Sequence, residues 1–139
     1  MAVELSWFLT ERILYFRYTG IVTVDDIHRA TEQAVMMGNQ VSTGTVHALH
    51  NATDLHALPI NLKLLTSIST RGFRHPRSGW SVAHGLDNRV IRYVGSAVAE
   101  LARARYKLVA EEADALRFLQ QVDPALPDLF ALTGKRLHV

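Results

Sequence analysis

The chain contains no cysteine among its 139 residues. This absence excludes disulfide bonds, thiolate catalysis, cysteine-ligated zinc and iron–sulfur clusters. Long apolar runs are absent as well, because no window approaches the roughly 18 uninterrupted apolar residues of a membrane span. The first residues carry no basic region followed by an apolar stretch, so no secretory signal is recognisable. We therefore expect a cytoplasmic protein without a membrane span.

An excess of charge of one sign is also lacking. The chain has 15 Lys and Arg residues against 13 Asp and Glu residues, which leaves a formal net charge of +2. So small an excess gives no reason to expect nucleic acid as a partner. Apolar residues make up 48% of the chain, which is enough for the core of one domain. We expect a single domain over residues 1–139, with its core at about 5–122 and a C-terminal tail at 123–139.

Hydrophobic periodicity divides the chain into strands and helices. Two strand-like runs open it, and three helix-and-strand alternations and a closing helix follow. Thr23 and Asp26 have the spacing of a helix-capping box, and Gly38 is placed to end the same helix. The expected strands cover residues 5–9, 13–18, 45–49, 80–86 and 107–110. The expected helices cover about residues 23–38, 58–69, 88–105 and 113–123.

This alternation of elements predicts the fold class. Strands joined through helices by short connections run parallel, with right-handed crossovers. The opening hairpin adds an antiparallel strand at the N-terminal edge. We predict an α/β fold with a mostly parallel sheet. The tail holds four apolar side chains that are costly to expose, and we expect them to be buried on their own domain or on a second copy, while 134–139 fray. These four are Leu126, Leu129, Phe130 and Leu132.

Three stretches of the chain carry a family resemblance. They are ILYFRYTGIVTVDD at 13–26, the strand-to-helix segment at 80–88, and YKLVAEEADALRFLQ at 106–120. Together with the order of elements over residues 5–122, they resemble the STAS-like, or SpoIIAA-like, proteins. The resemblance implies a βα superhelix, and a regulatory or ligand-binding role rather than catalysis.

The resemblance also implies a face that binds protein partners, around the start of the second helix. Some family members are switched there by phosphorylation of a serine in an Asp-Ser-x-Gly motif. This chain reads HNATDLHALPINL at 50–62, so the serine is missing and that switch cannot operate. We still expect partner contacts from this segment. The expected partner-binding residues are His50, Asn51, Thr53, Asp54, His56 and Asn61.

Seven histidines raise the question of a metal site. The densest group is His47, His50 and His56. On a strand, residues 47 and 50 point to opposite faces, and the spacing matches no established ligand pattern. We therefore expect no metal, and no other cofactor.

A second group of residues suits a small ligand. Arginines next to aromatic side chains can hold a phosphate or a carboxylate, and the carboxyl end of a parallel strand is a frequent ligand site. His84 lies at such an end. The expected ligand-binding residues are Arg71, Arg74, Trp80 and His84.

No catalytic motif is present: the chain has neither a G-x-S-x-G serine motif nor a phosphate-binding loop. We therefore expect a protein that is not an enzyme, and we name no catalytic residue. Our first hypothesis is a STAS-like module that binds a protein partner or itself, as a homodimer. The alternative is a carrier or sensor of a small apolar or anionic ligand. A hydrolase or isomerase that uses His84 and Asp87 is a third reading.

Overall fold

The computed structural model describes residues 2–132, and it begins with the expected hairpin. Strands β1 (Val3–Leu9) and β2 (Ile13–Ile21) pair in antiparallel fashion. The turn between them includes Glu11 at φ 65°, in the left-handed region. Both strands are rich in aromatic and branched residues, which suit a pleated and half-buried surface.

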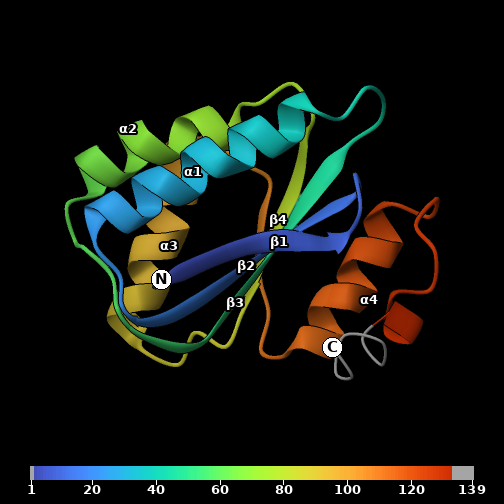
Figure 1. Cartoon of the computed structure of the whole chain (residues 1–139). Coiled ribbons are helices and arrows are strands. Elements are labelled where there is room, and N and C mark those ends of the chain that lie inside the picture. Colours follow the sequence, from blue (N-terminus) through green and yellow to red (C-terminus); the bar gives the residue numbers. More distant parts are fainter. Residues whose placement is uncertain (1, 133–139) are drawn as a thin grey trace.

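Three further strands extend this hairpin into one sheet (Figure 1). They are β3 (Val46–Ala57), β4 (Ser78–His84) and β5 (Tyr106–Leu108). Each is parallel to the strand before it, and the strand order in the sheet is β1-β2-β3-β4-β5. The predicted α/β fold, with a mostly parallel sheet and an antiparallel N-terminal edge, is confirmed.

Among residues 2–132, four longer helices cover the two faces of the sheet unequally, and a short helical segment follows at 129–132 (Figure 1). Helices α1 (Val24–Asn39), α2 (Leu62–Phe73) and α3 (Arg89–Leu101) pack side by side on one face, and we call them the helical layer. Helix α4 (Glu112–Val122) lies against the other face. Side chains of β2 alternate between the two faces of the sheet. Leu14 and Phe16 point toward α1, while Ile13 and Tyr15 point toward α4.

The segment after α4 completes the core on the α4 side. Leu126 and Leu129 are buried there with Leu116 and Leu119, and Leu132 packs against this cluster. The expectation that the tail is buried therefore holds for these residues on their own chain. Phe130 is the exception, since its side chain remains 42% exposed. The expected fraying at 134–139 lies outside the described residues.

Several predicted boundaries were wrong, each for a local reason. Strand β3 continues to residue 57 instead of 49, because its second half still pairs with β2. Helix α2 consequently starts at Leu62 instead of about 58, and the Asn61 side chain accepts a hydrogen bond from the Leu64 N–H at 3.1 Å. Gly38 lies inside α1, whose C-cap is Gln40. Helix α3 ends at Leu101, ahead of Arg103 at φ 56°.

No helix within residues 2–132 combines the length and the apolar character that crossing a membrane requires.

Candidate ligand cavity

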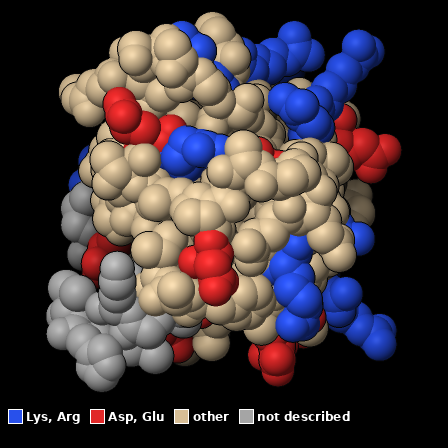
Figure 2. Space-filling model, turned by 90° about the vertical axis from the view of Figure 1, so that its right-hand side faces the viewer, with Lys and Arg blue, Asp and Glu red and all other residues tan. Residues whose placement is uncertain are grey.

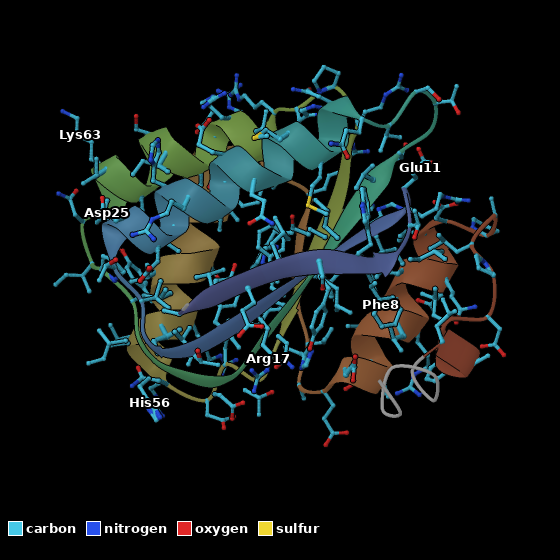
Figure 3. The ribbon with its side chains drawn as sticks, viewed as in Figure 1. Phe8, Glu11, Arg17, Asp25, His56 and Lys63 are labelled. Carbon is cyan, nitrogen blue, oxygen red and sulfur yellow. The ribbon has the colours of Figure 1, made fainter. Side chains whose placement is uncertain are left out.

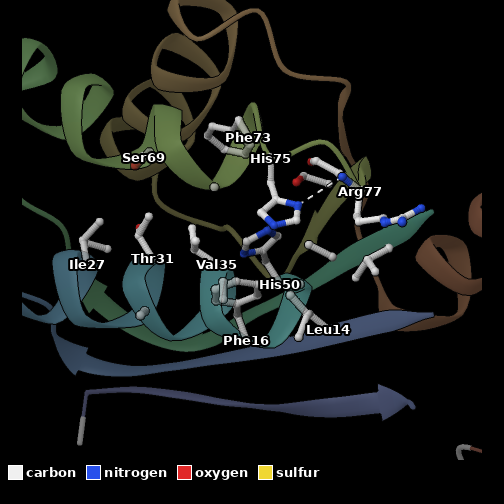
Figure 4. Close-up of a pocket in the computed structure, with 18 of the residues that line it drawn as sticks. Leu14, Phe16, Ile27, Thr31, Val35, His50, Ser69, Phe73, His75 and Arg77 are labelled. Atoms are coloured by element: carbon white, nitrogen blue, oxygen red, sulfur yellow. Dashed lines mark hydrogen bonds between the residues drawn. The ribbon is translucent and has the colours of Figure 1, made fainter. Parts of the chain in front are cut away.

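A cavity of about 140 Å³ lies between the sheet and the first part of the helical layer (Figure 4). We call it the α1 cavity. Its floor comes from the alternate residues of β2 and β3 that point toward α1, and its roof from α1 and α2. Most of the lining is apolar. Representative lining residues are Leu14, Phe16, Ala34, Val35, Ala48 and Phe73.

A second cavity of about 120 Å³ continues under α2 and α3, and we call it the α3 cavity. Its lining is again mainly apolar, from Leu55, Leu58, Leu65, Ile91, Val94 and Val98. The two cavities share five lining residues, so they adjoin beneath the helical layer. The shared residues are Tyr18, Ile27, His50, Ser69 and Phe73.

A polar pair stands where the two cavities meet. The Tyr18 hydroxyl lies 2.8 Å from Nδ1 of His50. The imidazole stacks on Phe16, with ring centroids 4.4 Å apart and an interplanar angle of 19°. Burial lowers the pKa of His50 to about 4, with a smaller contribution from His84, and burial raises the pKa of Tyr18 above its ordinary value. Both side chains are therefore uncharged at neutral pH.

His75 and Arg77 close the outer end of the α1 cavity. Nδ1 of His75 accepts a hydrogen bond from the Arg77 N–H at 3.0 Å, so Nε2 carries the proton that is donated to Asn39 Oδ1 at 2.7 Å. The Arg77 guanidinium donates to the carbonyl oxygens of Ser42 and Gly44. Gly38 permits this closure, because a Cβ there would lie 3.1 Å from the His75 ring.

The four predicted ligand-binding residues do not line either cavity. Trp80 is on the α4 side of the sheet, where it meets Phe118 edge-on at 4.9 Å. His84 is only 4% exposed, and its Nε2 has no hydrogen-bond partner among residues 2–132. Arg71 pairs with Glu32 on the outer surface, and Arg74 is exposed beyond α2. The structure therefore does not bring the four together at one point.

The six predicted partner-binding residues have different surroundings. His50 faces the cavities, and Asn51 points to the opposite face, where its amide donates to the Tyr15 hydroxyl at 2.8 Å. Thr53, Asp54 and His56 are exposed, and Figure 3 shows His56 pointing away from the helices. Asp54 pairs with Arg17 at 3.0 Å, while Asn61 caps α2.

Sequence reasoning missed the role of Tyr18 and Phe16 beside His50. The signal was the alternation of β2, which places residues 14, 16 and 18 on one face. His50 pairs with Phe16 in the β2–β3 register, and an irregularity follows between Arg17 and Thr19. Without that register, an inward-facing histidine could not be distinguished from a surface one.

A second histidine, His47, points to the α4 side, as the alternation predicted. Its Nδ1 accepts the Trp80 N–H at 3.0 Å, and its Nε2 donates to Asp123 Oδ2 at 2.9 Å. Arg12 lies 3.4 Å from the same carboxylate oxygen. The two ring nitrogens thus connect β4 with the end of α4. Within residues 2–132 there is no group of three or more His, Cys, Asp or Glu side chains that could hold a metal ion.

Charges on the surface do not form a field of one sign on the face shown in Figure 2. Lys and Arg lie mainly toward the margins of this face, Asp and Glu are interspersed, and a broad uncharged area lies between them. Nucleic-acid binding draws on a continuous basic stripe or patch. This face offers none.

Comparison with known proteins identifies the fold. No family model matches the sequence, and no curated protein matches it. A solved structure does match, from an uncharacterized protein of the DUF3478 family with a SpoIIAA-like fold from Shewanella loihica PV-4. The match has a TM-score of 0.58 and 18% sequence identity, and it covers 85% of this chain and 92% of that one. The chain thus has a SpoIIAA-like fold, as its motifs implied, and this fold hosts the two cavities.

Proposed function

We propose that this chain is a non-enzymatic binding module that holds a small, largely apolar molecule beneath its helical layer, as a carrier or a sensor. The observation that carries the proposal is the pair of adjoining cavities, which meet at the half-buried Tyr18–His50 pair. Ligand pockets commonly combine an apolar lining with a few placed polar groups. The cavities have this composition.

The size of the cavities supports a ligand. An apolar cavity of about 150 Å³ stays dry and accepts a molecule of the size of benzene. The α1 cavity, at about 140 Å³, and the α3 cavity, at about 120 Å³, each match that capacity. Both cavities are partly open to solvent, so a bound ring-sized molecule would remove their apolar lining from water.

Native mass spectrometry of the full chain, purified without refolding, tests the proposal. We expect an added mass that is retained under native conditions and is lost on denaturation. Ala34 lines the α1 cavity from α1, so Ala34→Leu should fill it and reduce the adduct. The matched control is Ala125→Leu, at an exposed position after α4. A bare mass for the unaltered chain, or an adduct that survives Ala34→Leu unchanged, would contradict the proposal.

Self-association is a second candidate function, favoured by a separate observation. Four apolar side chains that are each more than half exposed lie where β2 and β3 end and where α3 begins. Because parallel strands end at the same edge of a sheet, these residues belong to one edge of the molecule. They are Ile21, Ile60, Val90 and Tyr93, with exposed fractions of 58–73%.

Oligomeric state tests this second candidate. If a second copy covers this edge, the double variant Ile60→Asp, Val90→Asp should convert a dimer to a monomer in light scattering. Leu101→Asp is the matched control, because Leu101 is equally exposed at the far end of α3. A monomer from the unaltered chain at high concentration would exclude self-association through this edge.

A further inference from the structure

The hydrogen bond between Tyr18 and His50 fixes which ring nitrogen carries the proton. Among residues 2–132, Nδ1 of His50 is the hydrogen-bond partner of the Tyr18 hydroxyl, at 2.8 Å. A phenol has one proton to donate, and burial without an acceptor would leave it unsatisfied. Tyr18 therefore donates, and Nδ1 accepts. A neutral imidazole whose Nδ1 accepts carries its hydrogen on Nε2.

Nε2 of His50 is consequently a hydrogen-bond donor that faces the cavities. His50 lines both cavities, and its Nε2 makes no hydrogen bond within the described part of the chain. One face of the imidazole is covered by Phe16, which leaves the edge of the ring for a bound molecule (Figure 4). This nitrogen is not among the fully buried polar atoms that lack a partner, so water can reach it, and a ligand that displaces that water must offer an acceptor to keep the hydrogen bond.

We infer that the ligand is an uncharged, ring-sized apolar molecule with a hydrogen-bond acceptor such as a carbonyl oxygen, which receives the Nε2–H of His50. This inference rests on the proposed function and names the chemical class of its ligand. The acceptor would sit at the junction of the two cavities, and the apolar parts would extend beneath α1 and α3.

The surroundings of His50 disfavour an anionic ligand. Neither Lys nor Arg lines the α3 cavity in the described residues, and the arginine of the α1 cavity, Arg77, is engaged by two backbone carbonyls at its outer end. The imidazole is itself neutral at pH 7, since burial lowers its pKa to about 4. A carboxylate would lose its hydration here without gaining a positive partner. This refines the expectation of an apolar or anionic ligand in favour of a neutral one.

Three probes of nearly identical shape separate the contribution of a hydrogen-bond acceptor from that of a negative charge. Acetophenone carries a neutral acceptor, α-methylstyrene replaces its oxygen by a methylene group, and benzoate replaces its methyl group by a charged oxygen. Each is titrated into the full chain at pH 7 by calorimetry. We expect acetophenone to bind about tenfold more tightly than α-methylstyrene, and benzoate to bind more weakly than both.

Two histidine variants test whether His50 causes the preference for acetophenone over α-methylstyrene. His50→Phe keeps an aromatic ring in the cavity and removes the donor, so acetophenone and α-methylstyrene should bind it equally. His56→Phe is the matched control on the exposed half of β3, and it should retain the tenfold preference. The comparison of the three probes needs only the unaltered chain, so it is decisive even if His50→Phe does not fold.

The outcomes distinguish this inference from the proposed function. Equal binding of acetophenone and α-methylstyrene to the unaltered chain overturns the inference and leaves the apolar cavity as a ligand site. Tighter binding of benzoate overturns it as well. If none of the three probes binds, the proposed function and the inference fall together.

Discussion

His47 donates a hydrogen bond from Nε2 to the carboxylate of Asp123 at 2.9 Å, and so joins the start of β3 to the residue that follows α4. The imidazole is only 4% exposed, and its other nitrogen accepts the Trp80 N–H. The contact connects residues that are 76 positions apart in the chain. It therefore holds the closing helix in place on its face of the sheet.

Loss of this carboxylate should destabilise the fold. Asp123→Ala leaves the buried His47 N–H without an acceptor, and we expect the free energy of unfolding to fall by about 1–3 kcal/mol in urea denaturation. Asp123→Asn keeps an oxygen acceptor without the charge and should lose less. Asp87→Ala, in an exposed loop, is the control and should change stability by less than about 0.5 kcal/mol. Equal stability of Asp123→Ala and the control would show that the contact contributes nothing.

Stability should fall on mild acidification because His50 is buried as the neutral form. Its pKa is lowered from 6.5 to about 4 in the folded state, so between these values the unfolded chain binds the extra proton. The free energy of unfolding therefore decreases as the pH falls from 6.5 to about 4, and the lowered pKa of His84 adds a change of the same sign. Below this window a separate loss begins, since the lowered pKa values of Asp26 and Asp123 mean that protonation removes their hydrogen bonds.

Urea denaturation at a series of pH values measures this dependence. His50→Phe should flatten the slope between pH 6.5 and 4, because the variant has no proton to bind at that position. His56→Phe should leave the slope as it is in the unaltered chain, since residue 56 is exposed. If His50→Phe has the same slope as the unaltered chain, then the histidine is not buried in its neutral form.

Two glycine substitutions should have opposite effects on stability. A Cβ at Gly79 would lie 2.5 Å from Nδ1 of His47 and from Cγ2 of Thr45, so Gly79→Ala must displace the His47 ring. We expect a loss of about 1–3 kcal/mol. At Gly72, inside α2, the nearest atom is Cγ2 of Thr31 at 3.6 Å, which is an ordinary contact. Gly72→Ala should be neutral or stabilising by up to about 1 kcal/mol, because alanine favours helices. Thermal denaturation of both variants checks the contrast, and a stable Gly79→Ala would contradict it.

The segment after α4 should contribute to stability as a core element does. Leu129 is fully buried against the α4 side of the sheet, and truncation to alanine should cost about 2–5 kcal/mol by leaving a cavity. Its neighbour Phe130 is 42% exposed, so Phe130→Ala should cost clearly less. Comparable losses in the two variants, measured by chemical denaturation, would mean that Leu129 is not packed as described.

Local signals in the sequence predicted the fold well. The capping box of α1 is an example, since the Asp26 N–H donates to Thr23 Oγ1 at 3.2 Å and the Thr23 N–H donates to Asp26 Oδ2 at 2.8 Å. Both bonds lie within four residues, so the pattern of residue types is sufficient to indicate them. The alternation of strands and helices likewise predicted the parallel sheet.

The cavities could not be read from the sequence in the same way. They depend on the separation between the sheet and α1, which small residues such as Ala34 and Ala48 influence only after the elements have packed. The Tyr18–His50 bond depends on the β2–β3 register, which shifts just after Arg17. The polar second half of β3 also concealed its strand character, because it contains Asn51, Thr53 and Asp54.

The strand order of the sheet repeats the order of synthesis, because each strand pairs with the one that precedes it in the chain. Each parallel pairing nevertheless spans a crossover helix, as between Ile13 and His47, so a strand can join the sheet only after the helix before it has been made. The sheet face that carries Ile13, Leu49 and Val82 is buried later, because the residues that pack on it come from α4 and from the segment up to residue 129. During translation this apolar face stays open until that cover has been made. The nascent chain is therefore most prone to aggregation shortly before the sheet is closed on both sides.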